Sequence, residues 1–113
     1  MKVYDEAHRL ARELAASKEY RNLIETRKKL KNDSKTEDMV KDFRMKQFEL
    51  QAAQLTGQEG IAEKEEKLQQ LYTVISANSL AREVLEAEHN FNRLYTDVQK
   101  IINEAIEDSI DLE

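Results

Sequence analysis

Few side chains in this sequence could support acid–base or metal chemistry. It contains two histidines, His8 and His89, which lie far apart along the chain. Glu86 and His89 form one Glu-x-x-His step, a spacing that brings both side chains to one face of a helix. A di-metal site in a helical bundle needs two such steps and two further inward-facing carboxylates. A single step is typical of a solvent-exposed helix face, so we predict no metal site.

The usual nucleophiles and cofactor-binding loops are also missing. The chain has no Cys, which excludes a disulfide framework, a thiolate metal site and a Cys nucleophile. Two Gly are too few for a glycine-rich loop around a phosphate. The serines fall where helices are expected to begin or end, and this is typical of capping residues. We therefore expect no catalytic residue, no cofactor and no enzymatic activity.

The composition predicts an all-α protein. The 113 residues include no Pro, and 36% of them are charged. All-β folds need many tight turns, and the Gly and Pro that form such turns are nearly absent. The length fits a single domain over residues 1–113. No apolar run approaches a membrane span and no apolar segment of a secretory signal is present, so we expect a cytoplasmic protein without membrane insertion.

Apolar residues recur at helical spacing in five segments, which predict helices at residues 3–16, 18–31, 35–56, 61–77 and 80–108. Ser17 is expected to cap the second helix, and Asn78 or Ser79 the fifth. Ser34 with Glu37 three residues later has the spacing of a capping box, which predicts the start of the third helix. Gly57 suits the left-handed position that follows a helix end.

The helix expected at 35–56 carries two apolar stripes on roughly opposite faces. The first stripe comprises Met39, Val40, Phe43 and Leu50. The second comprises Met45, Phe48, Ala52 and Leu55. A helix that is apolar on two sides must be covered on two sides. We therefore predict that the second stripe lies in a subunit interface or beneath another helix.

The helix expected at 80–108 has a sustained heptad pattern. Val84, Phe91, Val98 and Ala105 recur every seven residues, with Leu80, Ala87, Leu94 and Ile101 as companion positions. A seam of this length needs a long partner helix. We expect the two long helices to pair in antiparallel fashion, with the helix at 61–77 alongside. This predicts an antiparallel helical bundle that is completed by a homodimer or a higher homo-oligomer.

Charge is divided unevenly along the chain. Residues 1–56 carry 13 basic and 10 acidic residues, whereas residues 57–113 carry 5 basic and 13 acidic residues. Within the first half, basic residues concentrate at Arg27, Lys28, Lys29, Lys31 and Lys35. This basic cluster could contact RNA or an acidic partner. It could equally be a solvated helix end, where Lys and Arg favour the dipole.

Three segments of the sequence resemble the YlbF/YmcA family of small helical proteins from Gram-positive bacteria. The central one comprises Phe43, Arg44, Gln47, Leu50, Gln54 and Gly57. The flanking ones comprise Tyr4, Asp5, Ala7, Leu10, Leu14, Ser17 and Tyr20, and then Asn78, Ser79, Leu80, Ala87, Glu88, Phe91 and Leu94. The resemblance implies an all-α, homo-oligomeric, cytoplasmic protein without enzymatic activity of its own. It also implies a role as an accessory factor of RNase Y-dependent RNA maturation, with links to competence, biofilm formation and sporulation.

Two features differ from the family pattern. The helix after Asn78 often begins with Pro in the family, and here it begins with Ser79. Members that bind an iron–sulfur cluster use Cys, which this chain lacks. The chain therefore resembles the YheA-like branch, which lacks the cluster-binding Cys.

Two functional hypotheses follow. The first is a non-catalytic regulatory adaptor that acts through helix-face contacts with itself and with protein partners of the RNase Y accessory type. The alternative is direct RNA binding through the basic cluster at residues 27–35. The isoelectric point of about 5.2 argues against general affinity for nucleic acid.

Overall fold

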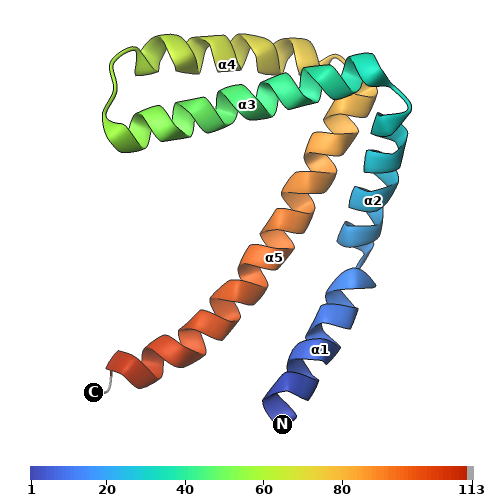
Figure 1. Ribbon diagram of the computed structural model, residues 1–113, viewed down its shortest axis with the longest axis vertical. Helices are drawn as coiled ribbons and strands as arrows, with labels where there is room; N and C mark the ends of the chain where they lie inside the picture. The colour runs from blue at the N-terminus through green and yellow to red at the C-terminus, as the bar shows by residue number, and fades with distance from the viewer. Residues whose placement is uncertain (112–113) are drawn as a thin grey trace. The chain divides into compact units, whose positions relative to one another are not determined.

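The computed structural model describes the backbone of residues 1–111 and the side chains of residues 1–107 (Figure 1). It contains five α-helices and, within that range, no strand. The helices are α1 (Lys2–Ala15), α2 (Lys18–Lys31), α3 (Ser34–Thr56), α4 (Ile61–Ser76) and α5 (Ser79–Asp111). The expected all-α class is confirmed, and four of the five helices end within a residue of the expected position. The exception is α5, which continues to Asp111, three residues beyond the expected end.

The chain divides into two compact units that cut across α2 and α5. One is the continuous segment Thr26–Leu85, which we call the hairpin unit. The other joins Met1–Glu25 to the chain from Glu86 onward, and we call it the terminal unit.

The hairpin unit is built around α3 and α4, which lie side by side and run in opposite directions (Figure 1). The link between them contains Gly57 and Gly60, with φ values of 67° and 81°. Glycine adopts this left-handed conformation without the steric cost that a Cβ brings. A link this short makes consecutive helices antiparallel neighbours. The expectation that the fourth helix lies alongside the third is confirmed, since α4 packs along α3.

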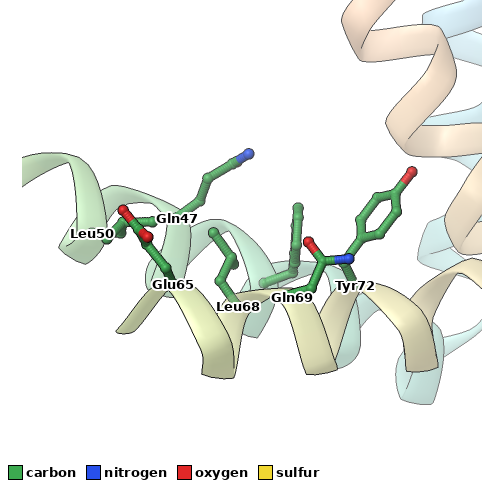
Figure 2. Close-up of a pocket in the computed structure, with 7 residues that line it drawn as sticks. Gln47, Leu50, Glu65, Leu68, Gln69 and Tyr72 are labelled. Carbon is green, nitrogen blue, oxygen red and sulfur yellow. The ribbon is translucent and has the colours of Figure 1, made fainter. Parts of the chain in front are cut away.

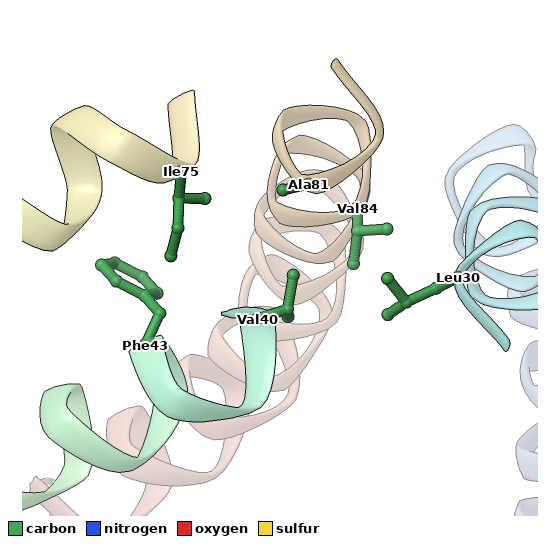
Figure 3. Packing of buried hydrophobic residues seen from close by; sticks show 6 residues of the cluster. All are labelled: Leu30, Val40, Phe43, Ile75, Ala81 and Val84. Atoms are coloured by element: carbon green, nitrogen blue, oxygen red, sulfur yellow. The ribbon is translucent and has the colours of Figure 1, made fainter. Parts of the chain in front are cut away.

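Four helices supply the core of the hairpin unit. Its buried side chains are Leu30 from α2, Val40 and Phe43 from α3, Ile75 from α4, and Ala81 and Val84 from α5 (Figure 3). Val40, Ile75 and Val84 are fully buried. The first predicted stripe of α3 is confirmed as its inward face, since Val40, Phe43 and Leu50 are all buried.

A hydrogen-bonded chain joins the starts of α3 and α5 within the hairpin unit. The Asp33 carboxylate accepts from the Thr36 backbone N–H at 3.1 Å and from its hydroxyl at 2.8 Å. The same hydroxyl accepts from Asn78 Nδ2 at 3.1 Å, and Asn78 Oδ1 caps α5 by accepting from the Ala81 N–H at 3.0 Å. We call Asp33, Thr36 and Asn78 the cap network. Buried polar groups such as the Thr36 hydroxyl are stable only when they are hydrogen-bonded.

The cap network corrects one prediction and confirms another. Asp33, not Ser34, caps α3, and Ser34 is the first helical residue. The carboxylate of Asp33 is favoured here because it carries a full negative charge at the positive end of the helix dipole. Asn78 caps α5, as expected, and Gly57 takes the left-handed position after α3.

The terminal unit contains α1, the start of α2 and most of α5. Ser17 caps α2, as predicted, by accepting from the Tyr20 N–H at 3.1 Å. The Tyr20 and Phe91 rings meet with centroids 5.4 Å apart, so the first part of α2 contacts the heptad seam of α5. Leu23 and Ala87 are buried in this unit, whereas α1 contributes no buried residue.

Candidate interaction surfaces

The second apolar stripe of α3 is largely open to solvent in the single chain. Met45 is 60% exposed, Phe48 71% and Leu55 88%, while Ala52 is half-buried. By helical spacing these four side chains lie on the side of α3 opposite to Phe43 and Leu50, which line the groove towards α4. Single exposed apolar residues are ordinary, but a contiguous row of them is typical of an interaction site. This row is the strongest candidate for a subunit or partner interface.

Short-range ion pairs accompany the stripe on α3. Lys41 Nζ lies 3.3 Å from Glu37 Oε1, and Lys46 Nζ lies 2.6 Å from Asp42 Oδ1. Both pairs join residues four apart, a spacing that gives helices modest support. The charges that border the stripe are thus held along the helix surface.

Arg44, a further charged residue of α3, is half-buried. Burial disfavours the charged form and lowers the pKa of Arg44, and the positive charge of Arg27 adds to the effect. An arginine remains protonated at neutral pH even after such a shift.

The basic cluster is spread over the end of α2 and the start of α3. Its five members, Arg27, Lys28, Lys29, Lys31 and Lys35, are all exposed. Lys29 lies 4.0 Å from Glu83, which offsets part of the positive charge. Lys28, Lys29 and Lys31 occupy the last turn of α2, where cations interact favourably with the helix dipole.

Asp33 lies among these basic residues. Its two hydrogen bonds from Thr36 hold the pKa of the Asp33 carboxyl below its usual range, and Lys35 adds a smaller effect in the same direction. Asp33 therefore remains charged at neutral pH and further divides the basic surface. The cluster is an exposed patch with interspersed acidic groups.

An open groove between α3 and α4 was not predicted from the sequence (Figure 2). It has a volume of about 400 Å³ and is lined by Phe43, Gln47, Leu50, Glu65, Leu68, Gln69 and Tyr72. The Phe43 and Tyr72 rings, which both line the groove, pack with centroids 5.9 Å apart. At the other end, Gln54 donates to Glu65 across the two helices at 3.3 Å. Only the inward spacing of Phe43 and Leu50 hinted at this groove, because its other wall depends on how α4 returns along α3.

Nothing in the groove resembles a reaction centre. Its polar side chains are two amides, one carboxylate and one phenol, and no nucleophile stands beside a base. Among the described residues, no three His, Asp or Glu side chains converge to hold a metal ion. His8 and His89 are both exposed positions of the terminal unit.

The terminal unit also has exposed apolar side chains, on α1 and towards the end of α5. On α1, Val3, Tyr4 and Leu10 are exposed despite their regular helical spacing. Towards the end of α5, Ile101 is 68% exposed, and Ile102 and Ile106 are also open. The heptad pattern of α5 predicts a covered seam, and its last part is not covered in the single chain. None of the helices, over their described lengths, is long and apolar enough to cross a membrane.

Known proteins with similar sequences identify the family of this chain. The sequence matches the family described as "Control of competence regulator ComK, YlbF/YmcA" over residues 3–107. It is 44% identical over 112 residues to a UPF0342 protein of Desulfitobacterium hafniense, covering 99% of this chain and 90% of the relative. It is 42% identical over 105 residues to a UPF0342 protein of Symbiobacterium thermophilum, covering 93% of this chain and 94% of the relative. The match spans both units and all five helices, so the chain belongs to the YlbF/YmcA family.

Proposed function

We propose that this protein is a non-catalytic regulatory adaptor that acts in the cytoplasm as a homo-oligomer. In this proposal Met45, Phe48, Ala52 and Leu55 form the contact surface between copies or with a protein partner. The observation that carries the proposal is the exposure of this stripe on a helix whose opposite face is already covered by α4.

The size of the stripe is consistent with a specific but reversible contact. Fully burying a Leu, Met or Phe side chain contributes roughly 1.5–3 kcal/mol. Association costs at least about 4 kcal/mol in lost translational and rotational freedom. Three large side chains from each of two copies contribute about 9–18 kcal/mol together, which exceeds this minimum cost.

The family supports a regulatory rather than a catalytic role. Its description concerns control of the competence regulator ComK. The resemblance to accessory factors of RNase Y points to protein partners of that type, and surface contacts are the means by which a chain of this composition would reach them. The residues lining the α3–α4 groove offer no arrangement for acid–base or nucleophilic chemistry, which agrees with an adaptor role.

Sedimentation equilibrium tests the contact surface. A charge at the centre of the stripe, Phe48→Glu, should convert the oligomer to a monomer because a buried carboxylate without a partner is strongly unfavourable. Val74→Glu is a matched control, since Val74 is an exposed aliphatic residue of α4 at 59% exposure, away from the stripe. The expected result is loss of the oligomer in the first variant alone. A monomeric unsubstituted protein would contradict the proposal.

Direct RNA binding through the basic cluster is the alternative. The ion pair between Lys29 and Glu83 and the charged Asp33 both reduce the local positive potential. Titration with single-stranded and structured RNA at low salt distinguishes the two functions. Phosphate contacts would give an affinity that falls steeply with salt concentration, and we expect no such binding.

A further inference from the structure

The exposed stripe of α3 extends further toward the start of the helix in the same register. Asp38, Met45 and Ala52 are seven residues apart, and so are Lys41, Phe48 and Leu55. The two sets alternate at spacings of three and four residues, which is the pattern of a coiled-coil seam. We call these six residues the α3 seam. Apart from the half-buried Ala52, all of them are exposed.

We infer that the α3 seam pairs with the α3 seam of a second copy in antiparallel orientation, around a two-fold axis at the level of Leu50. This inference rests on the proposed function, which holds that the stripe is a contact surface, and it adds the identity of the partner and the direction of pairing. Leu50 itself faces α4, so the pairing leaves the α3–α4 hairpin unchanged.

The sizes of the side chains favour the antiparallel direction. In that arrangement Phe48 lies opposite Ala52 of the second copy, and Met45 lies opposite Leu55. The two Phe48–Ala52 layers then combine a large side chain with a small one, which gives interdigitated packing, and the Met45–Leu55 layers pair two unlike side chains of similar size. In the parallel arrangement Phe48 would face Phe48 and Ala52 would face Ala52. One layer would then be overfilled and the next would leave a void, and both defects destabilise an interface.

The charged residues of the α3 seam independently favour the antiparallel direction. Parallel pairing would place Asp38 against Asp38 and Lys41 against Lys41 in two successive layers of the seam. Like charges that face each other directly cost several kcal/mol at an interface. Antiparallel pairing moves this charged end beyond Leu55 of the second copy. There Lys41 comes level with the link after α3, which carries the exposed Glu59.

The antiparallel arrangement has one unfavourable feature. Glu49 borders the seam near the two-fold axis, so the two copies bring their Glu49 side chains toward each other. Glu49 is exposed, and solvent and salt screen a pair of this kind. One screened pair at the rim is a smaller penalty than two layers of like charge inside the seam.

Self-complementarity identifies the second copy as the occupant. A two-fold axis requires that residue i meets residue j while j meets i. About an axis at residue 50, Phe48 meets the small Ala52 and Lys41 comes level with Glu59, so the helix and the link after it supply their own complement in size and charge. A different partner would not need the seam to match its own reverse in both size and charge.

Distances between spin labels measure the direction of pairing directly. The chain contains no Cys, so each single-Cys variant carries one label per copy. Gln51→Cys lies beside the proposed axis, and Lys35→Cys lies at the start of α3; both positions are exposed and outside the seam. With a rise of 1.5 Å per residue, antiparallel pairing separates the two Lys35 positions by about 45 Å along the axis, against about 3 Å for Gln51.

The expected result is a short distance at residue 51 and a long one at residue 35. Similar short distances at both positions would overturn the antiparallel direction and leave the proposed function intact. A monomer without any interspin distance would overturn both. Adding Phe48→Asp to each labelled chain should remove the distances and weaken association at least 100-fold. Distances that survive this substitution would show that a different surface joins the copies and would overturn the inference.

Discussion

The hairpin unit and the terminal unit use similar apolar spacing but reach different degrees of burial. In the hairpin unit, Val40, Ile75 and Val84 are fully buried among four helices. In the terminal unit, α1 has no buried residue, and Ile101 remains 68% exposed near the end of α5. Regular heptad or helical spacing therefore prepares a face for burial without ensuring that it is covered.

The connections between helices explain the difference. In the hairpin unit, a short glycine-containing link returns α4 along α3, and the cap network joins the starts of α3 and α5. These features fix which apolar faces meet. In the terminal unit, Ser17 caps α2 locally by bonding Leu14 and Tyr20, and neither bond reaches another part of the chain. In the hairpin unit the covered faces thus belong to helices that are joined by a glycine-containing link and by a long-range hydrogen bond.

The largest expected difference between the two units is in the cost of truncating an apolar side chain. Ile75→Ala should destabilise the protein by about 2–5 kcal/mol, because it removes fully buried methyl and methylene groups and leaves a cavity. Ile101→Ala makes the same chemical change at an exposed position and should cost under about 0.5 kcal/mol. Urea unfolding at one fixed protein concentration measures both values. Equal losses would show that the face of α5 around Ile101 is covered in solution and would end the contrast between the units.

The cap network should have the next largest effect. Thr36→Val keeps the shape of the side chain but removes the hydroxyl that joins Asp33 to Asn78. Because Thr36 is 2% exposed, the lost hydrogen bonds leave polar groups with poor access to water, at a cost of about 1–3 kcal/mol. Thr73→Val is the control, since the exposed Thr73 hydroxyl bonds only within its own helix, to Gln69 O. Similar small changes in both variants would show that the network contributes little.

The aromatic pairs offer a finer comparison. Tyr20–Phe91 in the terminal unit and Phe43–Tyr72 in the hairpin unit have centroid distances of 5.4 and 5.9 Å and are both tilted. Double-mutant cycles with Leu at each position should give couplings of about 0.5–1.5 kcal/mol for both pairs, because ring geometry sets this quantity. The single change Phe43→Leu should nevertheless cost more than Phe91→Leu, since Phe43 is buried and Phe91 half-buried. The reverse order would place the better-packed interior in the terminal unit.

Local features of the fold could be predicted from the sequence. Helix positions followed from apolar spacing, and Ser17, Gly57 and Asn78 were placed correctly because capping depends on residues three or four apart. The cap of α3 was placed one residue late because Ser34 and Glu37 match the capping-box spacing, while Asp33 has the stronger acceptor. That choice depends on the Thr36 hydroxyl, whose second bond goes to Asn78, 42 residues away.

Pairing between distant helices was harder to predict. The matching lengths of α3 and α5 favour pairing between these two helices. The link that contains Gly57 and Gly60 instead makes α4 the neighbour of α3. The α3–α4 groove was missed for the same reason, since Leu68 and Tyr72 meet Phe43 only after α4 folds back. The stripe of Met45, Phe48, Ala52 and Leu55 could be found from the sequence because all four belong to one helix. Its role as an interface stays a prediction.

Lowering the pH should affect the Asp33 cap of α3 but not the Ser17 cap of α2. We expect this to be the smallest of the predicted effects. The pKa of Asp33 is lower in the folded protein than in the unfolded chain, because Thr36 bonds the charged carboxylate. Its contribution to stability is therefore fully present above the unfolded pKa of about 3.9 and is lost as the pH falls through the lower folded value. Ser17, the corresponding cap in the terminal unit, has no titrating group.

Amide NMR spectra should show the Thr36 N–H shifting with an acid midpoint below about 3.9, while the Tyr20 N–H keeps its position until global unfolding. In Asp33→Asn the Thr36 titration should disappear. A Thr36 midpoint at or above the ordinary Asp value would contradict the bonding that ties α3 to α5.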